Sequence, residues 1–322
     1  MSWQPTMEWK VAQQRAEILK MIRAFFAERD VVEVETPALS NNTITDIHLE
    51  AIVTDYHYST SGSRIPLYLQ TSPEYAMKRL LASGYGDIYQ LSKAFRNEPA
   101  GRIHNPEFTM LEWYRLGYDQ HRLISEVAEL LMIVLDVTDV EKITYQDVFV
   151  KNTAIDPLTT SLEECLSYIE VIGKQAQWLT ESNDLDTLLQ FIFCEQLEPI
   201  IGKEIPCFVY DFPASQASLA KINDKDERVA SRFECYYKGI ELVNGFDELD
   251  DYTVQLSRFN EDLDKRKALG LPYKAIDERF MQAIKHGLPN CAGVALGVDR
   301  LVMLALEAKH IQSVITFPVE KS

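Results

Sequence analysis

The twenty residues FRNEPAGRIHNPEFTMLEWY, numbers 95–114, decide the fold of this chain. They read as the end of one strand, a loop over 96–106 that holds Gly101 and two prolines, and a return strand from Glu107. Side chains alternate along a strand, so every second residue of the return strand should share one face. On the face of interest we expect Phe108, Met110, Glu112 and Tyr114.

This face and the first residue of the loop suit a nucleotide beside a small cation. The ring of Phe108 can stack on a base, while Glu112 and Tyr114 can surround an ammonium group. Arg96 stands at the strand end, where its planar guanidinium matches the oxygens of a phosphate. The residues around Arg96 alone would equally fit an amphipathic hairpin with a surface ion pair, but the whole stretch favours a binding site.

A second hairpin carries a pair of acidic residues. Lys238 and Gly239 form a plausible two-residue turn between two strands. That turn places Tyr236 opposite Glu241, with Glu234 as the diagonal neighbour on the same face. Two carboxylates at this separation can share Mg²⁺ ions that also bind phosphates. The alternative is an acidic hairpin that is simply solvated.

The end of this hairpin holds a further carboxylate, Glu248. In a regular strand Glu248 would lie on the face opposite to Glu241, because side chains alternate. A bulge at Gly245 would return it to the same face, since glycine within a strand often marks a bulge. We therefore expect a bulge there.

The order of elements predicts an α+β fold, because strands come in antiparallel pairs with helices between the pairs. The expected helices cover about 7–29, 74–82, 121–136, 184–198, 253–269 and 275–286, with a last one from 299. The expected strands cover 31–35, 87–95, 107–114, 206–211, 231–237, 240–249 and 293–296. We predict one domain over 1–322, with a possible helical insertion at about 150–200.

The composition is that of an ordinary globular protein, with 46% apolar and 25% charged residues. The 32 Lys and Arg against 49 Asp and Glu give a net charge of −17, which argues against a nucleic-acid partner, although a local basic patch remains compatible with it. Neither G-x-x-x-x-G-K-[ST] nor G-x-G-x-x-G occurs. We therefore expect any nucleotide to bind on an antiparallel sheet.

The cysteines and the N-terminal residues bear on the cellular compartment. Five cysteines without a C-x-x-C pair argue against a disulfide framework or a zinc ribbon, and indicate the reducing cytoplasm. No apolar run reaches about 18 residues, so we expect no membrane span. Residues 1–5 show no basic stretch before an apolar one, so we expect no secretory signal.

Three segments resemble the motifs of class II aminoacyl-tRNA synthetases. Residues 31–37 and the helix before them resemble motif 1, 95–114 resembles motif 2, and Gly293-Val294-Ala295-Leu296-Gly297-Val298-Asp299-Arg300 resembles motif 3. The resemblance implies the class II catalytic fold, an antiparallel β-sheet flanked by helices. It also implies a bent ATP with Mg²⁺, and a homodimer through motif 1.

Further segments resemble the lysine-specific branch of this class. They are Ser72-Pro73-Glu74, residues 104–110, and residues 241–249. The resemblance implies that Glu74 holds the amine near the substrate backbone, and that Tyr114 and Glu248 hold the ε-ammonium. Burying a compact cation requires opposite charge nearby, so convergent carboxylates make chemical sense for a lysine-like ligand.

Carried onto this sequence, the resemblance implies a role for each matching residue. Arg96 and Arg300 would be catalytic, with Arg300 at the γ-phosphate. The ATP contacts would include both arginines and Asn97, Glu98, His104, Asn105, Phe108, Glu241, Leu242 and Gly297. The substrate contacts would be Ser72, Pro73, Glu74, Glu112, Tyr114, Asn244, Glu248 and Ala295. The metal ligands would be Glu234 and Glu241.

The chain departs from lysyl-tRNA synthetases at its start. The motif 1 helix begins about seven residues from the first residue, which leaves no room for the five-stranded OB-fold domain that reads the anticodon. In this the chain resembles the EpmA (PoxA/GenX) family of shortened paralogues, and Ser72, Ala295 and the loop 101–104 also differ from the tRNA enzymes. Members of that family attach (R)-β-lysine to a lysine of elongation factor P.

This second resemblance implies a protein acceptor, elongation factor P, and no tRNA. It implies (R)-β-lysine as the substrate, with L-lysine as a weaker one. Two alternatives stay open: a minimal lysyl-tRNA synthetase that charges tRNA or another RNA, and a non-catalytic synthetase-like regulatory subunit. The second alternative predicts the loss of motif arginines or metal carboxylates, and Arg96, Glu234, Glu241 and Arg300 are all present.

Overall fold

The computed structural model describes residues 3–57 and 64–322, so Met1 and Ser2 of the N-terminal segment lie outside the described residues. The chain divides into two compact units. Unit 1 comprises Met1–Tyr118, Ile133–Asp136 and Leu249–Ser322, and unit 2 comprises Asp119–Met132 and Val137–Glu248. The single domain over 1–322 stays a prediction.

Unit 1 is built on strands from both ends of the chain. Its larger sheet has the order β1-β5-β6-β12, formed by Val32–Glu33, Ile88–Phe95, Glu107–Leu116 and Cys291–Gly297. The pairs β5–β6 and β6–β12 are antiparallel, while β1–β5 is parallel. A smaller antiparallel sheet has the order β2-β4-β3, formed by Leu39–Ser40, Arg64–Leu69 and Val53–His57.

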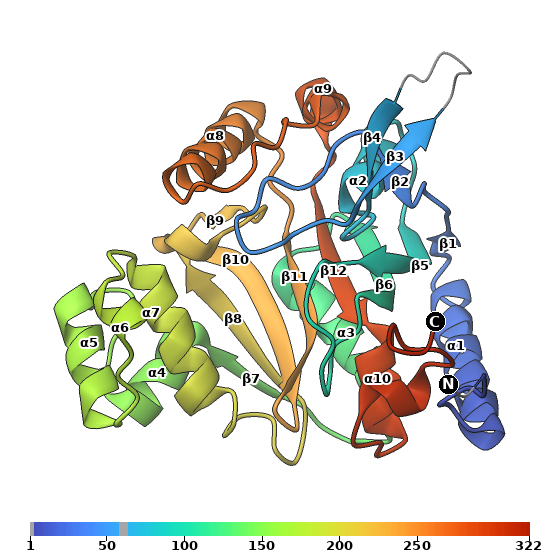
Figure 1. The fold of residues 1–322 in the computed structure, drawn as a ribbon, viewed down its shortest axis with the longest axis horizontal. Helices are drawn as coiled ribbons and strands as arrows, with labels where there is room; N and C mark the ends of the chain where they lie inside the picture. The colour runs from blue at the N-terminus through green and yellow to red at the C-terminus, as the bar shows by residue number, and fades with distance from the viewer. Residues whose placement is uncertain (1–2, 58–63) are drawn as a thin grey trace. The chain divides into compact units, whose positions relative to one another are not determined.

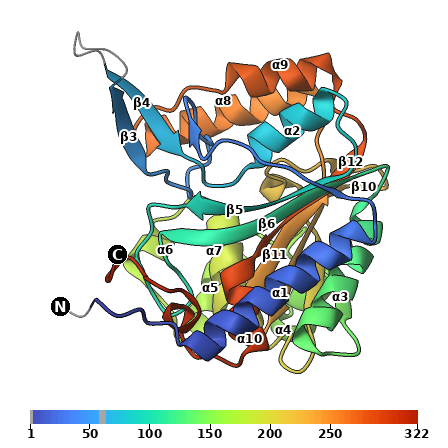
Figure 2. The same cartoon turned by 90° about the vertical axis from the view of Figure 1, so that its right-hand side faces the viewer.

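Helices cover both faces of this larger sheet (Figure 2). On one face lie α1 and α10, at Trp9–Ala27 and Val298–Ala305. On the other face lie α2, α8 and α9, at Glu74–Ala82, Tyr252–Ala268 and Glu278–Gly287. Ile22 and Phe26 of α1 are fully buried, which is the result expected for a helix whose apolar residues recur at helical spacing. The ring of Phe26 packs on Tyr89 of β5 and Trp113 of β6, so apolar contacts on the α1 face help to hold β5 and β6 in place.

Unit 2 has its own sheet, in the order β11-β10-β8-β7, with β9 beside β10. In chain order its strands β7 to β11 are Glu141–Thr144, Cys207–Pro213, Ile222–Asn223, Asp226–Tyr237 and Ile240–Asp247. The pair β7–β8 is parallel and the pairs β8–β10, β9–β10 and β10–β11 are antiparallel. Most of α3, Gln120–Leu135, also belongs to this unit.

Four helices, α4 to α7, lie beside β7 and β8 of unit 2 (Figure 1). They span Tyr145–Thr153, Leu162–Val171, Gln177–Thr180 and Leu185–Ile192, and a π-helical turn continues α7 over Phe193–Leu197. Their core is aromatic: Tyr145 stacks on Phe193 at 5.4 Å between ring centroids and lies 4.8 Å from Phe212 of β8. Helices therefore do occupy the stretch from about 150 to 200.

The predicted α+β fold is confirmed, and each long predicted element is present. The predicted helix 74–82 has the observed bounds of α2, because an acidic residue opens its first turn and Ser83 ends it. The short elements β2, β3, β4, β7, β9, α4, α5 and α6 were missed. The capping box of Ser161 and Glu164 at the start of α5 could have revealed that helix.

The turn between β10 and β11 has the predicted geometry. Lys238 and Gly239 have φ angles of 51° and 68°, the left-handed values of the hairpin turn that matches strand twist. Tyr236 pairs with Glu241, as predicted. The bulge is at Leu242 and not at Gly245, because Cys235 pairs with Val243 immediately before the shift.

The bulge at Leu242 achieves the change of face that was expected from Gly245. Glu234 pairs with Asn244, and Tyr236 pairs with Glu241, so Asn244 and Glu241 share the face of the two β10 residues. The residues after Asn244 continue this alternation, which returns Glu248 to the same face. The prediction chose the wrong residue because no particular residue type is required at a bulge, and Leu242 does not differ from an ordinary strand residue.

None of the five cysteines, all of which lie in the described part of the chain, forms a disulfide. Across residues 3–57 and 64–322, no helix has both the length and the apolar character that a membrane crossing requires.

Gly202 supports the turn of the β10–β11 hairpin and gives a test of the packing in unit 2. A Cβ at this residue would lie 2.2 Å from the carbonyl oxygen of Tyr236, and its φ of 60° is left-handed. We expect Gly202→Ala to lower the free energy of unfolding by about 2–3 kcal/mol in urea titrations. In Gly173, also left-handed, the Cβ would meet no described atom within 4 Å, so Gly173→Ala should cost only about 1 kcal/mol. Equal costs would contradict this assignment.

Candidate functional site

The start of α2 and the strand β6 bring four predicted substrate residues together. The hydroxyl of Ser72 donates to Oε2 of Glu112 at 2.7 Å, and the hydroxyl of Tyr114 donates to Oε1 of Glu112 at 2.7 Å. The backbone N–H of Glu74 donates to Oγ of Ser72 at 3.0 Å. Pro73 is the N-cap residue of α2 and connects Ser72 to the helix. The contact between the loop before α2 and β6 fixes the orientation of the Glu112 carboxylate.

This group of residues is buried and strongly charged. Glu112 is 2% exposed, and Lys78, one helical turn after Glu74, is 1% exposed. Nζ of Lys78 donates to Oε1 of Glu74 at 2.7 Å, so the buried ammonium has an ionic partner. Burial, and next the negative charge of Glu74, raise the pKa of Glu112 to about 7, against the opposing effects of Ser72, Tyr114 and Lys78. A cation placed here would lower that pKa again.

Three adjacent strands form the floor around Glu112. Ala295 of β12 and Gln90 of β5 both pair with Glu112, so the three side chains leave the same face of the sheet. One step along, Gly297 pairs with Met110. The residues of β12 beside Glu112 and Met110, Ala295 and Gly297, are both small.

The loop before β6 positions Arg96 and Asn97. The guanidinium of Arg96 lies over the ring of Phe108, 5.3 Å from its centroid, and its backbone N–H donates to the carbonyl of Pro106 at 2.9 Å. The backbone N–H of Asn97 donates to the carbonyl of Glu50 at 2.8 Å. Arg96 is thus placed by both the hairpin and the ring of Phe108, whereas the sequence analysis assigned that ring only to a base.

The other end of the same loop contacts α10. Nη2 of Arg300 lies 2.7 Å from Nε2 of His104, and its Nε donates to the carbonyl of Ile103 at 3.3 Å. The side chain of Asn105 donates to the carbonyl of Glu107 at 2.6 Å and accepts the backbone N–H of Val319 at 3.0 Å. Asn105 therefore fixes the loop in the structure, whatever its role toward a ligand. Glu98 is half-buried in the same loop.

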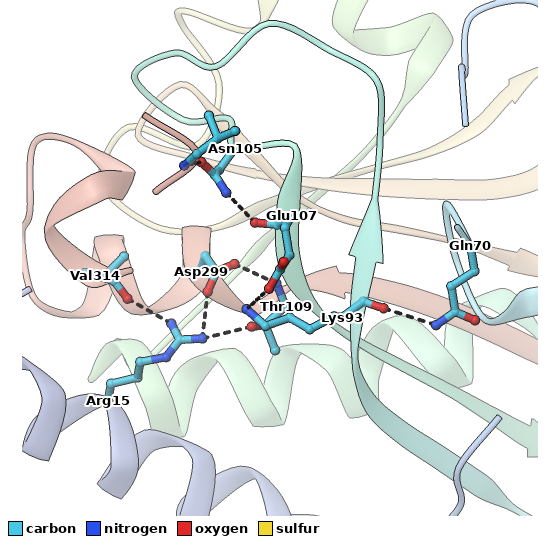
Figure 3. Close-up of polar contacts among 9 residues, drawn as sticks. Arg15, Gln70, Lys93, Asn105, Glu107, Thr109, Asp299 and Val314 are labelled. Carbon is cyan, nitrogen blue, oxygen red and sulfur yellow. Dashed lines mark hydrogen bonds and ion pairs between the residues drawn. The ribbon is translucent and has the colours of Figure 1, made fainter. Parts of the chain in front are cut away.

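Asp299 joins α1, β6 and α10 below this loop, as Figure 3 shows. Its Oδ1 lies 2.7 Å from Nη2 of Arg15, and its Oδ2 accepts the backbone N–H of Thr109 at 2.7 Å. Arg15 also donates to the Thr109 hydroxyl at 3.0 Å and to the carbonyl of Val314 at 3.3 Å. Asp299 is 2% exposed, and α10 has Gly297 as its N-cap with no side-chain cap. From the sequence alone, Asp299 could be interpreted as the residue that caps the start of α10. In the structure its carboxylate instead pairs with Arg15 and accepts the backbone N–H of Thr109 in β6.

Unit 2 contains the predicted metal carboxylate Glu234 on β10. Both oxygens of Glu234 have partners: Nη2 of Arg232 and the hydroxyl of Tyr236 donate to them. Arg232 also reaches Oδ1 of Asn244 at 3.3 Å, and its guanidinium lies over the ring of Phe212, 4.6 Å from the centroid. Arg232 therefore connects two predicted ligand-binding residues.

Strand pairing places a second carboxylate, Glu241 of β11, on the same face of the sheet as Glu234 of β10. Burial raises the pKa of Glu234 to about 7, Arg232 opposes this, and the charge of Glu241 raises the pKa further. Glu241 pairs with Tyr236, which itself bonds Glu234. Among the described residues no group of three or more His, Cys, Asp or Glu forms a ready metal site.

Two further predicted residues lie on or just after β11. Leu242 is the extra residue of the bulge and is 2% exposed. Glu248 is 1% exposed and forms an isolated bridge with Ala220, just beyond the end of β11. A carboxylate this deeply buried is unusual on structural grounds alone, which supports a ligand-directed interpretation.

The sequence analysis named Glu74, Glu112 and Glu234 as site residues, but it did not name their neighbours Lys78, Gln90 and Arg232. Lys78 could have been found, because it is four residues after Glu74 on one helix face. Arg232 could also have been found, because it is two residues from Glu234 on one strand face. Gln90 gave no signal, since only the register of β5 with β6 reveals that it neighbours Glu112.

The amino-acid sequence of the chain is similar to sequences of known proteins. Residues 4–321 match the family described as tRNA synthetases class II (D, K and N). The chain is 52% identical over 320 residues to the elongation factor P--(R)-beta-lysine ligase of Pseudoalteromonas translucida (strain TAC 125), covering 99% of this chain and 98% of the relative. Proteins of the same name from Vibrio cholerae and Hamiltonella defensa are 52% and 50% identical, over 99% and 100% of this chain and 98% of each relative.

The Asp299 contact in unit 1 can be tested by removing one charge. Asp299→Asn keeps an acceptor for Thr109 but leaves Arg15 without its buried anion, so we expect the free energy of unfolding to fall by about 3 kcal/mol. The matched control is Asp226→Asn, which breaks an exposed ion pair with Arg228 and should cost far less, because water screens exposed charges. Chemical unfolding followed by circular dichroism measures both, and similar losses would refute the special role of Asp299.

Proposed function

Because the chain belongs to the family of class II tRNA synthetases (D, K and N), we propose that it activates (R)-β-lysine with ATP and joins it to the ε-amine of a lysine on elongation factor P. The relatives that support this reaction are named elongation factor P--(R)-beta-lysine ligase, and they match the chain over nearly their whole length. Their names favour a protein acceptor over the two alternatives, a tRNA-charging enzyme and a non-catalytic subunit.

The observation in the structure that carries the proposal is the buried carboxylate of Glu112. Ser72 and Tyr114 donate hydrogen bonds to it, and the N–H of Glu74 donates to Ser72. These neutral donors do not cancel its charge, and a buried carboxylate is costly unless a cation or a proton neutralises it. Lys78 neutralises one of the two carboxylates, Glu74. The remaining negative charge suits one ammonium group of a diamino acid, and Ala295 and Gly297 limit the height of the floor beside it.

The nucleotide would be bound by residues of the loop and of its flanking strands. Arg96 would bind the α-phosphate and Phe108 would stack on the base, since the guanidinium already lies over that ring. Arg300 would bind the γ-phosphate. Asn97, Glu98, His104, Asn105, Leu242 and Gly297 complete the proposed ATP contacts.

Mg²⁺ fits the pair of carboxylates in unit 2. The charge of Glu241 raises the pKa of Glu234, and a cation bound between the two carboxylates would relieve this repulsion, which supports the proposal. Mg²⁺ commonly binds one or two carboxylates and takes its other ligands from phosphates and water, so Glu234 and Glu241 suffice. When bound, the ion would neutralise phosphate charge. Asn244 and Glu248 would bind the amino acid on this unit.

The chemistry needs no nucleophile from the protein. In the first step a carboxylate oxygen of the amino acid attacks the α-phosphorus, and the bond to the pyrophosphate oxygen breaks. Arg96 would stabilise the charge that develops on the phosphate oxygens. In the second step the neutral ε-amine of the acceptor lysine attacks the acyl carbon, AMP leaves with the bonding electron pair, and the amine loses a proton. Positioning supplies most of the rate enhancement.

The remaining parts of the proposal concern partners and location. We propose a homodimer through α1 and the motif 1 segment, where the partner would cover the apolar side chains of Trp9 and Val32, which are 77% and 59% exposed. L-lysine would be a weaker substrate than (R)-β-lysine. The acidic net charge of −17 supports a protein acceptor rather than tRNA, and we propose a cytoplasmic location.

The acceptor can be tested by mass spectrometry. The protein is incubated with ATP, Mg²⁺ and either (R)-β-lysine or L-lysine, together with elongation factor P or total tRNA. We expect elongation factor P to gain the mass of one lysyl group, faster with (R)-β-lysine, and tRNA to gain none. Arg96→Ala should abolish this gain, because the phosphate charge in the transition state loses its cation. A mass gain on RNA alone would reverse the acceptor assignment.

The buried carboxylate predicts a dependence of substrate affinity on pH. The pKa of Glu112 is raised to about 7, so its proton must leave before it can bind an ammonium. Below pH 7 we therefore expect the affinity for the amino acid to fall, approaching about tenfold per pH unit, while above pH 7 it should level off. Calorimetric titration with (R)-β-lysine at several pH values measures this. Glu112→Gln should bind more weakly with a flatter pH profile, and an unchanged profile would exclude Glu112.

A further inference from the structure

We infer that Gln90 of β5 is a substrate-recognition residue whose amide oxygen accepts a hydrogen bond from the amine that binds at Glu112. The inference deepens the proposed function and rests on it, since it concerns the same amine pocket. With Gln90, the strand β5 would also contribute to amine binding, and a neutral acceptor would stand beside the carboxylates of Glu74 and Glu112.

The position of Gln90 follows from the strand register. Gln90 and Glu112 are direct partners across the antiparallel pair β5–β6, so their side chains leave the same face of the sheet with adjacent Cβ atoms. On the other side of Glu112, Ala295 occupies the same row of the sheet. Glu112 thus has an amide on one flank and a small methyl group on the other. A ligand bound at Glu112 would therefore have the Gln90 amide beside it within the same row of the sheet.

The hydrogen bonding of Gln90 points to a ligand. The residue is 2% exposed, and no donor among residues 3–57 and 64–322 reaches its Oε1. Buried amide oxygens in folded proteins nearly always have a donor, and leaving one unmatched is unfavourable. In contrast, both oxygens of the neighbouring Glu112 carboxylate accept hydrogen bonds from protein groups. An ammonium, with three donors, can reach the Glu112 carboxylate and the unmatched oxygen together.

The charge balance explains why an amide serves better than a third carboxylate. Glu74 and Glu112 supply two negative charges, and the buried Lys78 offsets one. One incoming ammonium therefore brings the group of residues to neutrality. A third carboxylate at position 90 would leave an uncompensated buried charge, whereas an amide oxygen adds a hydrogen bond without adding charge.

The test compares Gln90→Met with wild type. Methionine has nearly the same shape but lacks the acceptor. We expect the KM for (R)-β-lysine in ATP–pyrophosphate exchange to rise by about ten- to a hundredfold, the range for a lost hydrogen bond to a charged group. The KM for ATP should stay the same. The midpoint of thermal unfolding in the absence of ligand should not fall, because the replaced oxygen has no donor within the described protein.

Two further variants separate recognition from structure. Lys93→Met changes an exposed residue on the same strand and should alter neither KM nor the unfolding midpoint. Gln90→Glu restores an acceptor oxygen, which a carboxyl group has in either protonation state, but it also brings the unfavourable buried charge when ionised, so it should recover only part of the lost affinity. An unchanged amino-acid KM in Gln90→Met would overturn the inference, as would a lower unfolding midpoint with the KM unchanged, or no recovery in Gln90→Glu.

The failure of this inference differs from a failure of the proposed function. If wild type activates (R)-β-lysine and Glu112→Gln loses affinity while Gln90→Met does not, only the role of Gln90 is wrong. If wild type neither binds (R)-β-lysine in calorimetry nor exchanges pyrophosphate with it, the proposed function fails and the inference fails with it.

Discussion

The register of β5, β6 and β12 is the constraint on which the rest of unit 1 depends. Backbone pairing aligns Gln90, Glu112 and Ala295 in one row and Met110 with Gly297 in the next. A shift by one residue would turn Glu112 to the opposite face and break its contacts with Ser72 and Tyr114. The register is held from outside the sheet, because Asp299 binds the backbone of Thr109 and pairs with Arg15 of α1.

Burial gives this row its chemical properties. A carboxylate in water is ionised at neutral pH, but Glu112 is enclosed by protein and lies close to the charge of Glu74, so its pKa rises to about 7. The same environment makes a matching cation valuable, since water does not screen it. Affinity for an ammonium and a raised carboxylate pKa therefore have one physical origin. Lys78 limits the effect by neutralising Glu74.

Unit 2 also contains a buried carboxylate with a raised pKa, Glu234, but an arginine and a bulge orient the residues around it. Arg232 holds Glu234 and Asn244 from one side, and the bulge at Leu242 turns Glu241 and Asn244 to a common face. The predicted bulge at Gly245 was wrong in position, although the change of face that it was meant to explain is present. A glycine permits a bulge but does not require one, and here Gly245 pairs regularly with Phe233.

The sequence by itself determined the long elements, the α+β class and the residues of the two hairpins. These depend on local patterns: helical spacing in α1, strand alternation from Glu107, and a turn at Lys238 and Gly239. The tertiary structure decided which of these residues are buried and what lies beside them. Lys78 next to Glu74 follows from one helix, but Gln90 next to Glu112 follows only from strand pairing. Pairing and burial join residues that are distant along the chain, and no local pattern records such contacts.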